Sequence, residues 1–241
     1  LNFESSSDTV SKPSLHRVAI GADGSLEELE NLPLPDGVDR LFSWPRISST
    51  PDGVAMAFRT GHQTRVATSQ DGIHFSNPTD IGPASGSAMA AVGALGQHGL
   101  VATYQIPGAG FDMDSWARVS VDGVHWAPPV KISDVSTNVH DTAILPRADG
   151  NVDLYYEHAS DSEGFSMQRR CLTSSGVLGP EERLMDSSVP DTMKPCPSRM
   201  ADGRILLTFV QGLDRDPATK AINSEQLQAV ILDQDAAAPQ E

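Results

Sequence analysis

Apolar and β-branched residues occur along this chain in short runs, and each run follows a turn that contains glycine. The clearest runs are residues 54–58, 100–104, 152–156 and 205–210. Runs of this length and composition are typical of β-strands. No segment has a convincing helical stripe, since the nearest candidate, residues 26–29, is too short. The pattern therefore predicts an all-β protein.

Two kinds of turn repeat with a common period. The first lies within the strand-rich runs, and its glycines, 46, 51 and 53 residues apart, are Gly53, Gly99, Gly150 and Gly203. The second lies between those runs, and its glycines, 48, 51 and 53 residues apart, are Gly24, Gly72, Gly123 and Gly176. Asp-Gly suits tight hairpins, because both residues tolerate positive φ. Two interleaved series with a period of about 50 residues indicate a repeat architecture.

Each repeat accommodates four strands, an inner hairpin followed by an outer hairpin, and such sheets repeated radially form a β-propeller. The length of 241 residues allows nearly five such units. Five outer pairs can be placed but only four inner hairpins, because the first outer pair, near residues 16–33, has only residues 1–13 before it. We therefore predict a single domain over residues 1–241, a five-bladed β-propeller of four-stranded blades with one incomplete blade and irregular ends at 1–13 and 236–241. A truncated propeller is the alternative.

The chain is acidic, with 32 acidic against 17 basic residues and a formal net charge of −15. Such a surface repels phosphate backbones and anionic lipids, which disfavours nucleic acid and membrane partners. No stretch approaches the roughly 18 apolar residues that cross a bilayer. The first residue is Leu1 rather than Met, which indicates that upstream residues were removed. The compartment stays open, with a secreted or periplasmic location favoured.

Several site chemistries lack their signatures. There is no Gly-rich phosphate loop, no Gly-x-Ser-x-Gly elbow and no His-Glu-x-x-His motif, which disfavours nucleotide enzymes, serine hydrolases and zinc peptidases. Cys171 and Cys196 are too few for a disulfide framework or a cysteine zinc site, and they form either one bridge or two free thiols. No cofactor is predicted, except that calcium could bind paired acids, namely Asp112 with Asp114 or Asp214 with Asp216.

The turn from Ser120 to Trp126, Ser-Val-Asp-Gly-Val-His-Trp, resembles the Asp-box of sialidases, one residue shorter than the usual form. The short form is more similar to the five-bladed glycoside hydrolases, the arabinanase, xylosidase and invertase group. The stretch from His140 to Leu145 is similar to the blade start of those enzymes. The resemblance implies a propeller and a carbohydrate-active enzyme of glycoside hydrolase type that acts on a glycan or another small molecule.

The resemblance also implies acids at the starts of the first three blades, and here the chain departs from the family. Residues 43–46 and 87–89 carry no acid, and only Asp141 stands where a catalytic carboxylate is expected. Arg46-Ile47 is similar to a sialidase blade start, but it precedes its turn glycine by only 7 residues. Neither the acidic set of the hydrolases nor the arginine triad of the sialidases is complete.

In a propeller the ligand sits at the axis, on the face formed by the starts of the inner strands. On this face, Asp141 with Glu157 or with Asp191 could supply the acid and base of glycoside hydrolysis. The residues expected to bind substrate there are Trp44, Arg46, His140, Tyr104 and Lys194. Two other functions stay open: a lectin-like propeller that binds glycans without catalysis, and a cyclase or lyase that uses the same axial pocket.

Overall fold

The structure, a computed structural model, describes residues 15–20, 22–38, 45–108, 112–133, 138–160, 164–186, 188–189, 191–216, 218–219, 221–233 and 235. Among these residues every regular element is a β-strand, and all pairings are antiparallel between strands adjacent in the chain. No described segment is a helix long and apolar enough to cross a membrane. The predicted irregular ends and Trp44 lie outside the described residues.

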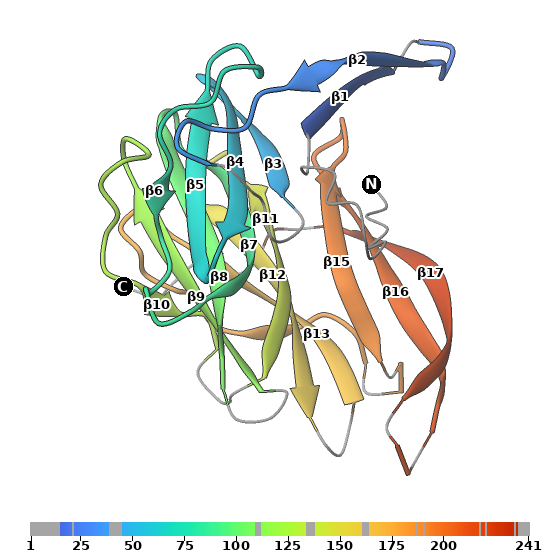
Figure 1. The fold of residues 1–241 in the computed structure, drawn as a ribbon. Coiled ribbons are helices and arrows are strands. Elements are labelled where there is room, and N and C mark those ends of the chain that lie inside the picture. Colours follow the sequence, from blue (N-terminus) through green and yellow to red (C-terminus); the bar gives the residue numbers. More distant parts are fainter. Residues whose placement is uncertain are drawn as a thin grey trace, which may run out of the picture.

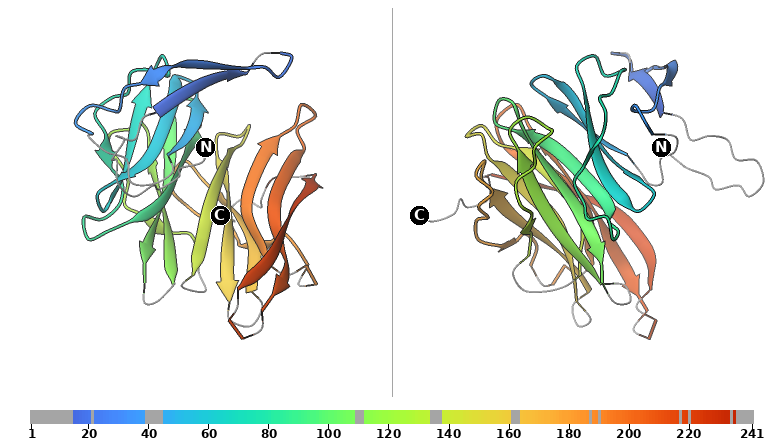
Figure 2. Two further views of the ribbon diagram at one scale, coloured as in Figure 1. Left: turned by 45° about the vertical axis from the view of Figure 1, so that its right-hand side comes forward. Right: turned by 60° about the vertical axis from the view of Figure 1, so that its left-hand side comes forward.

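The strands form five sheets arranged side by side (Figures 1 and 2). The first sheet contains β1 (Leu15–Ile20) and β2 (Leu26–Leu32). The second contains β3 (Arg46–Thr50), β4 (Gly53–Thr60), β5 (Gln63–Ser69) and β6 (Thr79–Asp80). The third contains β7 (Ala88–Leu95), β8 (Gly99–Pro107), β9 (Met113–Ser120) and β10 (Val130–Lys131). The fourth contains β11 (Val139–Pro146), β12 (Val152–Ser160), β13 (Gly164–Leu172) and β14 (Glu182–Arg183), and the fifth contains β15 (Thr192–Arg199), β16 (Ile205–Arg215) and β17 (Ile222–Leu232).

The strand count agrees with a propeller whose repeats are unequal. Three sheets have four strands each, as the repeat predicts, with a two-residue strand at the outer edge. The first sheet consists of an outer pair alone among the described residues, as its short upstream segment led us to expect. The fifth sheet has three described strands rather than four, which the repeat did not predict.

The Ser-x-Asp-Gly turns owe their shape to their own side chains. In the third sheet, the Asp122 carboxylate accepts hydrogen bonds from the backbone N–H groups of Val124 (2.9 Å) and His125 (2.7 Å). The Ser120 hydroxyl accepts a hydrogen bond from the Gly123 N–H at 2.8 Å. Gly123 has a φ of 75°, which an L side chain rarely adopts. The turn sequence therefore encodes its own backbone conformation.

Apolar side chains fill the space between successive sheets. Ala57 of β4 packs with Val92 of β7 and Tyr104 of β8, between the second and third sheets. Tyr155 of β12 packs with Leu207 of β16, between the fourth and fifth. The opposite face of the fifth sheet is more exposed, with Leu227 of β17 at 74%. Nearest-neighbour packing of this kind is what holds repeat proteins together.

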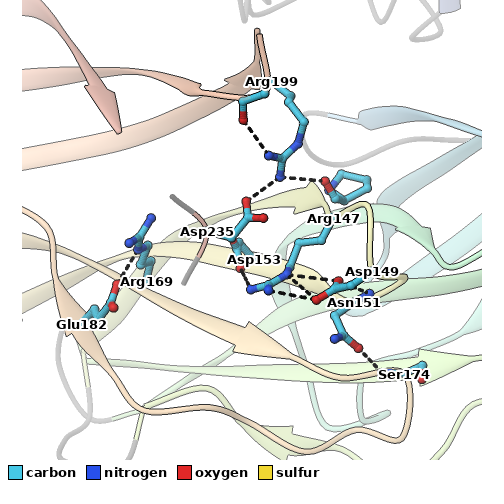
Figure 3. Close-up of polar contacts among 11 residues, drawn as sticks. Arg147, Asp149, Asn151, Asp153, Arg169, Ser174, Glu182, Arg199 and Asp235 are labelled. Atoms are coloured by element: carbon cyan, nitrogen blue, oxygen red, sulfur yellow. Dashed lines mark hydrogen bonds and ion pairs between the residues drawn. The ribbon is translucent and has the colours of Figure 1, made fainter. Parts of the chain in front are cut away.

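Polar contacts of two arginines lie where the fourth and fifth sheets meet, at the end that carries the glycine turns (Figure 3). Arg199 of β15 donates to the Pro146 carbonyl at 3.3 Å and to the Asp235 carboxylate at 2.7 Å. Arg147 bonds Asp153 at 3.1 Å, and the Asp153 side chain is fully buried. Because a buried charge needs a partner, this pair fixes the position of the turn that follows β11.

The two cysteines are free thiols in this structure. Cys171 lies buried in β13, where it pairs across the sheet with Asp153 of β12. Cys196 is exposed on β15 and pairs with Thr208 of β16. Of the two alternatives that the sequence left open, the structure shows the pair of thiols.

Candidate active site at the propeller axis

The inner strands of three consecutive sheets share an irregularity near their starts. The pairing register shifts between Ala88 and Ala90 in β7, between His140 and Ala143 in β11, and between Met193 and Cys196 in β15. Within each shift one residue adopts a positive φ, and these residues are Met89 (25°), Asp141 (35°) and Lys194 (54°). A left-handed backbone costs a non-glycine residue about 1–2 kcal/mol. Strained residues of this kind cluster at functional sites, which directs attention to these three positions.

The same strand starts lie together in space. Strand β3 packs on β7, β7 on β11, and β11 on β15, and the four inner strands run through the middle of the molecule in Figure 1. Their starts lie at the end opposite the glycine turns, because each glycine turn closes the hairpin at the far end of the strand. Residues from four sheets, Arg46, Met89, Asp141 and Lys194, therefore converge on one end of the axis.

Asp141 and Glu157 form a pair of acids at this end. Glu157, from β12, is only 4% exposed and accepts a hydrogen bond from the backbone N–H of Lys194. Burial and the nearby charge of Asp141 raise the pKa of Glu157 to about 8. Burial also raises the pKa of Asp141, against the opposing charges of Arg46, His140 and Lys194. Two neighbouring carboxyl groups in different environments are the arrangement from which acid–base pairs are built.

One oxygen of Asp141 is left without a hydrogen bond. Its Oδ1 atom is buried and has no partner among the described residues. A buried acceptor of this kind costs about 1–3 kcal/mol unless a ligand or water supplies a donor. The same residue also has a positive φ of 35°, so both features make Asp141 a candidate for contact with a ligand.

His140 stands beside the acid pair and is held from two sides. Its Nε2 atom lies 2.5 Å from Oδ1 of Asn138. Its ring meets the ring of Phe165 edge to face, with centroids 6.1 Å apart. Burial lowers the pKa of His140, while the charges of Asp141 and Asp112 raise it. The imidazole is therefore fixed in orientation next to Asp141.

Two cations border the pair. Lys194 has its ammonium Nζ 3.7 Å from Oε2 of Glu225, and its charge acts on both Asp141 and Glu157. Arg46 is exposed at the first position of β3, where the register has no shift. Its charge lowers the pKa of Asp141, so the two side chains lie near one another. The structure thus gathers Arg46, His140, Asp141, Glu157 and Lys194 from three different sheets.

Asp191 occupies a different environment, although the sequence made it a possible partner of Asp141. Its Oδ2 accepts from Nε of Arg215 at 2.9 Å, and its Oδ1 lies 2.6 Å from Nη2 of the same residue. Oδ1 also accepts from the Phe165 N–H at 3.0 Å. Both oxygens therefore already have partners, and these contacts join β13 to β16.

Tyr104 and Gln105 are consecutive residues of β8, so their side chains point to opposite faces of the third sheet. Tyr104, which the sequence placed among the substrate-binding residues, is 3% exposed and packs in the core between the second and third sheets. The next residue, Gln105, pairs with Ala88 before the β7 shift, as Glu157 pairs with His140 in β11. Its Nε2 donates to the Val139 carbonyl at 3.2 Å, and its Oε1 has no described partner. Sequence reasoning missed Gln105, and the repeat register is the signal that would have found it.

A separate cavity of about 610 Å³ opens at the other end of the molecule, between the turns of the second and third sheets. Among its lining residues, His98 pairs with Asp52 at 2.9 Å and His74 with Asp71 at 2.7 Å. These carboxylates already bind partners within or between turns. The cavity lies at the turn end, away from the acid pair.

The described residues contain no group of three or more His, Cys, Asp or Glu side chains placed to hold a metal ion. Of the paired acids considered for calcium, Asp114 instead forms an ion pair with Lys131 at 2.9 Å. Asp216 accepts from the backbone N–H groups of Ala218 (2.7 Å) and Thr219 (2.9 Å). The structure therefore adds no argument for calcium at these positions.

Comparison with known proteins gives a match in structure but not in sequence. No family model matches the chain, and no curated protein matches it. An α-L-arabinanase from Penicillium chrysogenum, solved with arabinobiose, aligns with a TM-score of 0.58 and 16% identity over 85% of this chain and 71% of that chain. An α-L-arabinofuranosidase from Fusarium graminearum aligns with a TM-score of 0.56 and 12% identity over 78% and 61%.

An endo-arabinase from Bacteroides thetaiotaomicron aligns with a TM-score of 0.54 and 11% identity over 96% of this chain and 97% of that chain. The chain thus spans 61% of the Fusarium enzyme and nearly all of the Bacteroides enzyme. At this level of identity the likeness concerns the fold. The chain has the five-bladed β-propeller fold of the arabinanase and xylosidase type of glycoside hydrolase.

Proposed function

We propose that this protein is a glycoside hydrolase that works from the axial end of its propeller, with Asp141 and Glu157 as its acid–base pair. The observation that carries the proposal is the pairing itself. Two carboxyl groups from adjacent strands of one sheet lie close enough for the charge of Asp141 to raise the pKa of Glu157. Glycoside hydrolysis requires two such groups in different protonation states.

The surroundings of the two groups support one division of the acid and base roles. With a pKa of about 8, Glu157 carries a proton at neutral pH and can donate it to the oxygen of the leaving group. Burial raises the pKa of Asp141, but the positive charges of Arg46, His140 and Lys194 oppose that rise and favour its ionised form. An ionised Asp141 can stabilise positive charge that develops on the sugar ring, or can activate water, and its unpartnered Oδ1 faces no competing donor among the described residues.

The first test is hydrolysis of arabinan, arabinobiose and a panel of aryl glycosides. Arabinose-containing substrates are included because three structurally similar proteins are an arabinofuranosidase, an endo-arabinase and an arabinanase. Replacing Asp141 with Asn and Glu157 with Gln should each lower kcat by about 10²–10⁴. Arg204→Gln serves as the control, since Arg204 bonds Asp202 in a turn at the opposite end. Turnover that persists unchanged in Asp141→Asn would remove this pair from the mechanism. A wild-type protein that binds sugars without releasing product would favour the lectin-like alternative.

A further inference from the structure

Arg46 is the least engaged charged residue at the axial end. No hydrogen bond or ion pair joins its guanidinium to another residue in the part of the chain that the structure describes. It is exposed, and it stands at the first position of β3, where that inner strand enters the axial end. Its side chain can therefore reorient toward a ligand without breaking a described contact.

The two acids at the axial end form no ion pair with Arg46 among the described residues. With a pKa of about 8, Glu157 carries a proton at neutral pH and adds no negative charge beside Arg46. Lys194 already lies 3.7 Å from the Glu225 carboxylate. Asp141 lies near enough for its charge to act on Arg46, but among the described residues no carboxylate forms an ion pair with the guanidinium as a counterion in direct contact. A ligand with an anionic group would supply that counterion beside the buried acid.

Besides Arg46, Asp141 offers a ligand a second contact, a hydrogen-bond acceptor. Its buried Oδ1 requires a donor that no described residue supplies, and a sugar hydroxyl is a donor of suitable size. Arginine binds carboxylates in a planar, bidentate manner that lysine cannot reproduce. A ligand that satisfies both residues carries hydroxyl groups and an anionic group on one ring.

We propose that the axial site takes a sugar that carries a carboxylate, with Arg46 binding the carboxylate and Asp141 accepting from a ring hydroxyl. This inference deepens the proposed function, since it names the substrate class of the same site. It makes Arg46 a residue that determines specificity. A neutral sugar has no carboxylate and could not form an ion pair with the Arg46 guanidinium.

The test measures binding separately from hydrolysis. D-glucuronate and D-galacturonate are titrated into the wild-type protein by calorimetry, with D-glucose and D-galactose as matched neutral sugars that differ only in the C6 group. The same titrations are made with Arg46→Gln, Arg46→Lys and Arg204→Gln. Arg204 is a matched control because its replacement removes the same charge at the turn end, where Arg204 bonds Asp202. Since Arg46 has no described partner, its replacement should leave the melting temperature unchanged.

We expect the wild-type protein to bind each uronate at least about tenfold more tightly than its neutral partner, a preference of about 1.4 kcal/mol. Arg46→Gln should abolish this preference, Arg46→Lys should retain part of it, and Arg204→Gln should retain all of it. Equal binding of uronates and neutral sugars overturns the inference, as does a preference that survives in Arg46→Gln or a lack of binding by all four sugars. Hydrolysis of neutral glycosides alone would uphold the proposed function and refute this inference. A preference for uronates without hydrolysis would do the reverse.

Discussion

The backbone N–H of Lys194 donates a hydrogen bond to the carboxyl group of Glu157, and this contact joins the fourth and fifth sheets at the axis. The donor points at Glu157 because Lys194 adopts a φ of 54° within the irregular start of β15. A backbone donor stays in place whatever side chain the residue carries. The position of the proposed general acid is therefore set by the fold and not by a neighbouring side chain.

Glu157→Gln should change how stability depends on pH. The folded pKa of Glu157, about 8, lies above its ordinary value of 4.5, so the folded state retains a proton that the unfolded state releases. The stability that this group contributes is complete below about pH 4.5 and is lost as the pH rises through about 8. Glutamine keeps the shape and does not titrate. Denaturant unfolding at pH 5 and pH 8 should show that the wild-type protein loses more stability than the variant, by on the order of a few kcal/mol.

Parallel stability profiles for the two proteins would contradict this prediction, because every other titrating group is common to both. Asp149→Asn is a useful comparison, since the pKa of Asp149 is lowered rather than raised. Its contribution to stability is present above the ordinary pKa of 3.8 and is lost on acidification. That variant should be less stable than the wild-type protein by a constant amount between pH 5 and pH 8, and the two stabilities should converge only as the pH falls below about 3.8.

Asp141→Asn should lower the pKa of Glu157. The negative charge of Asp141 is one of the two causes that raise this pKa, and an amide removes the charge while it preserves the shape. Titration of ¹³C-labelled glutamate carboxyl groups by NMR measures the midpoint directly. Asp202→Asn, at the turn end, should leave the Glu157 midpoint where it is. An unchanged midpoint in Asp141→Asn would show that the two acids are not coupled.

Asp191→Asn should destabilise the fold without removing catalytic chemistry. Asp191 is 3% exposed and binds Arg215 through both oxygens, so the change leaves a partly buried guanidinium without its anion. Breaking a buried pair costs about 3–5 kcal/mol. The melting temperature should fall clearly, while kcat per folded molecule at a temperature well below the transition should stay within about threefold of the wild-type value. A large fall in kcat with intact stability would instead return Asp191 to the acid–base chemistry.

The two thiols should differ in reactivity. Cys196 is exposed and Cys171 is buried, and burial raises the pKa of the Cys171 thiol, which further suppresses its thiolate. With a disulfide reagent such as DTNB, the native protein should release one equivalent rapidly, and a second should follow only in guanidinium chloride. Failure of either thiol to react after unfolding would mean that the two cysteines form a bridge under the conditions of purification.

The fold could largely be predicted from the sequence, because the side chains of the turn residues themselves form the hydrogen bonds that fix each turn. Asp122 and Ser120 form the hydrogen bonds of their turn within a few residues, so the same letters predict the same geometry wherever they recur. The fifth sheet was predicted less well. Its strand β17 runs over 11 residues and ends without a described fourth strand, and no local signal near Leu232 distinguishes that outcome from a complete blade.

For the candidate site, the sequence predicted which end of the molecule it occupies but not the contacts of its individual residues. Strand starts were enough to place Arg46, Asp141 and Lys194 at one end, because that end follows from the topology. The engagement of Asp191 depends on Arg215, 24 residues further along the chain, and the buried environment of Glu157 depends on Lys194 in the next sheet. Such long-range contacts have no signature in the spacing of residues.

The shared irregularity in β7, β11 and β15 has a consequence for how this protein can change over time. Methionine, aspartate and lysine occupy the same backbone position in three successive blades, and the strand pairing resumes after each of them. These three positions thus lie outside the regular strand pairing that holds each blade together. Point substitutions at Met89, Asp141 and Lys194 can therefore exchange one axial chemistry for another while the chain continues to fold, so that new specificities can arise in this scaffold by single mutational steps.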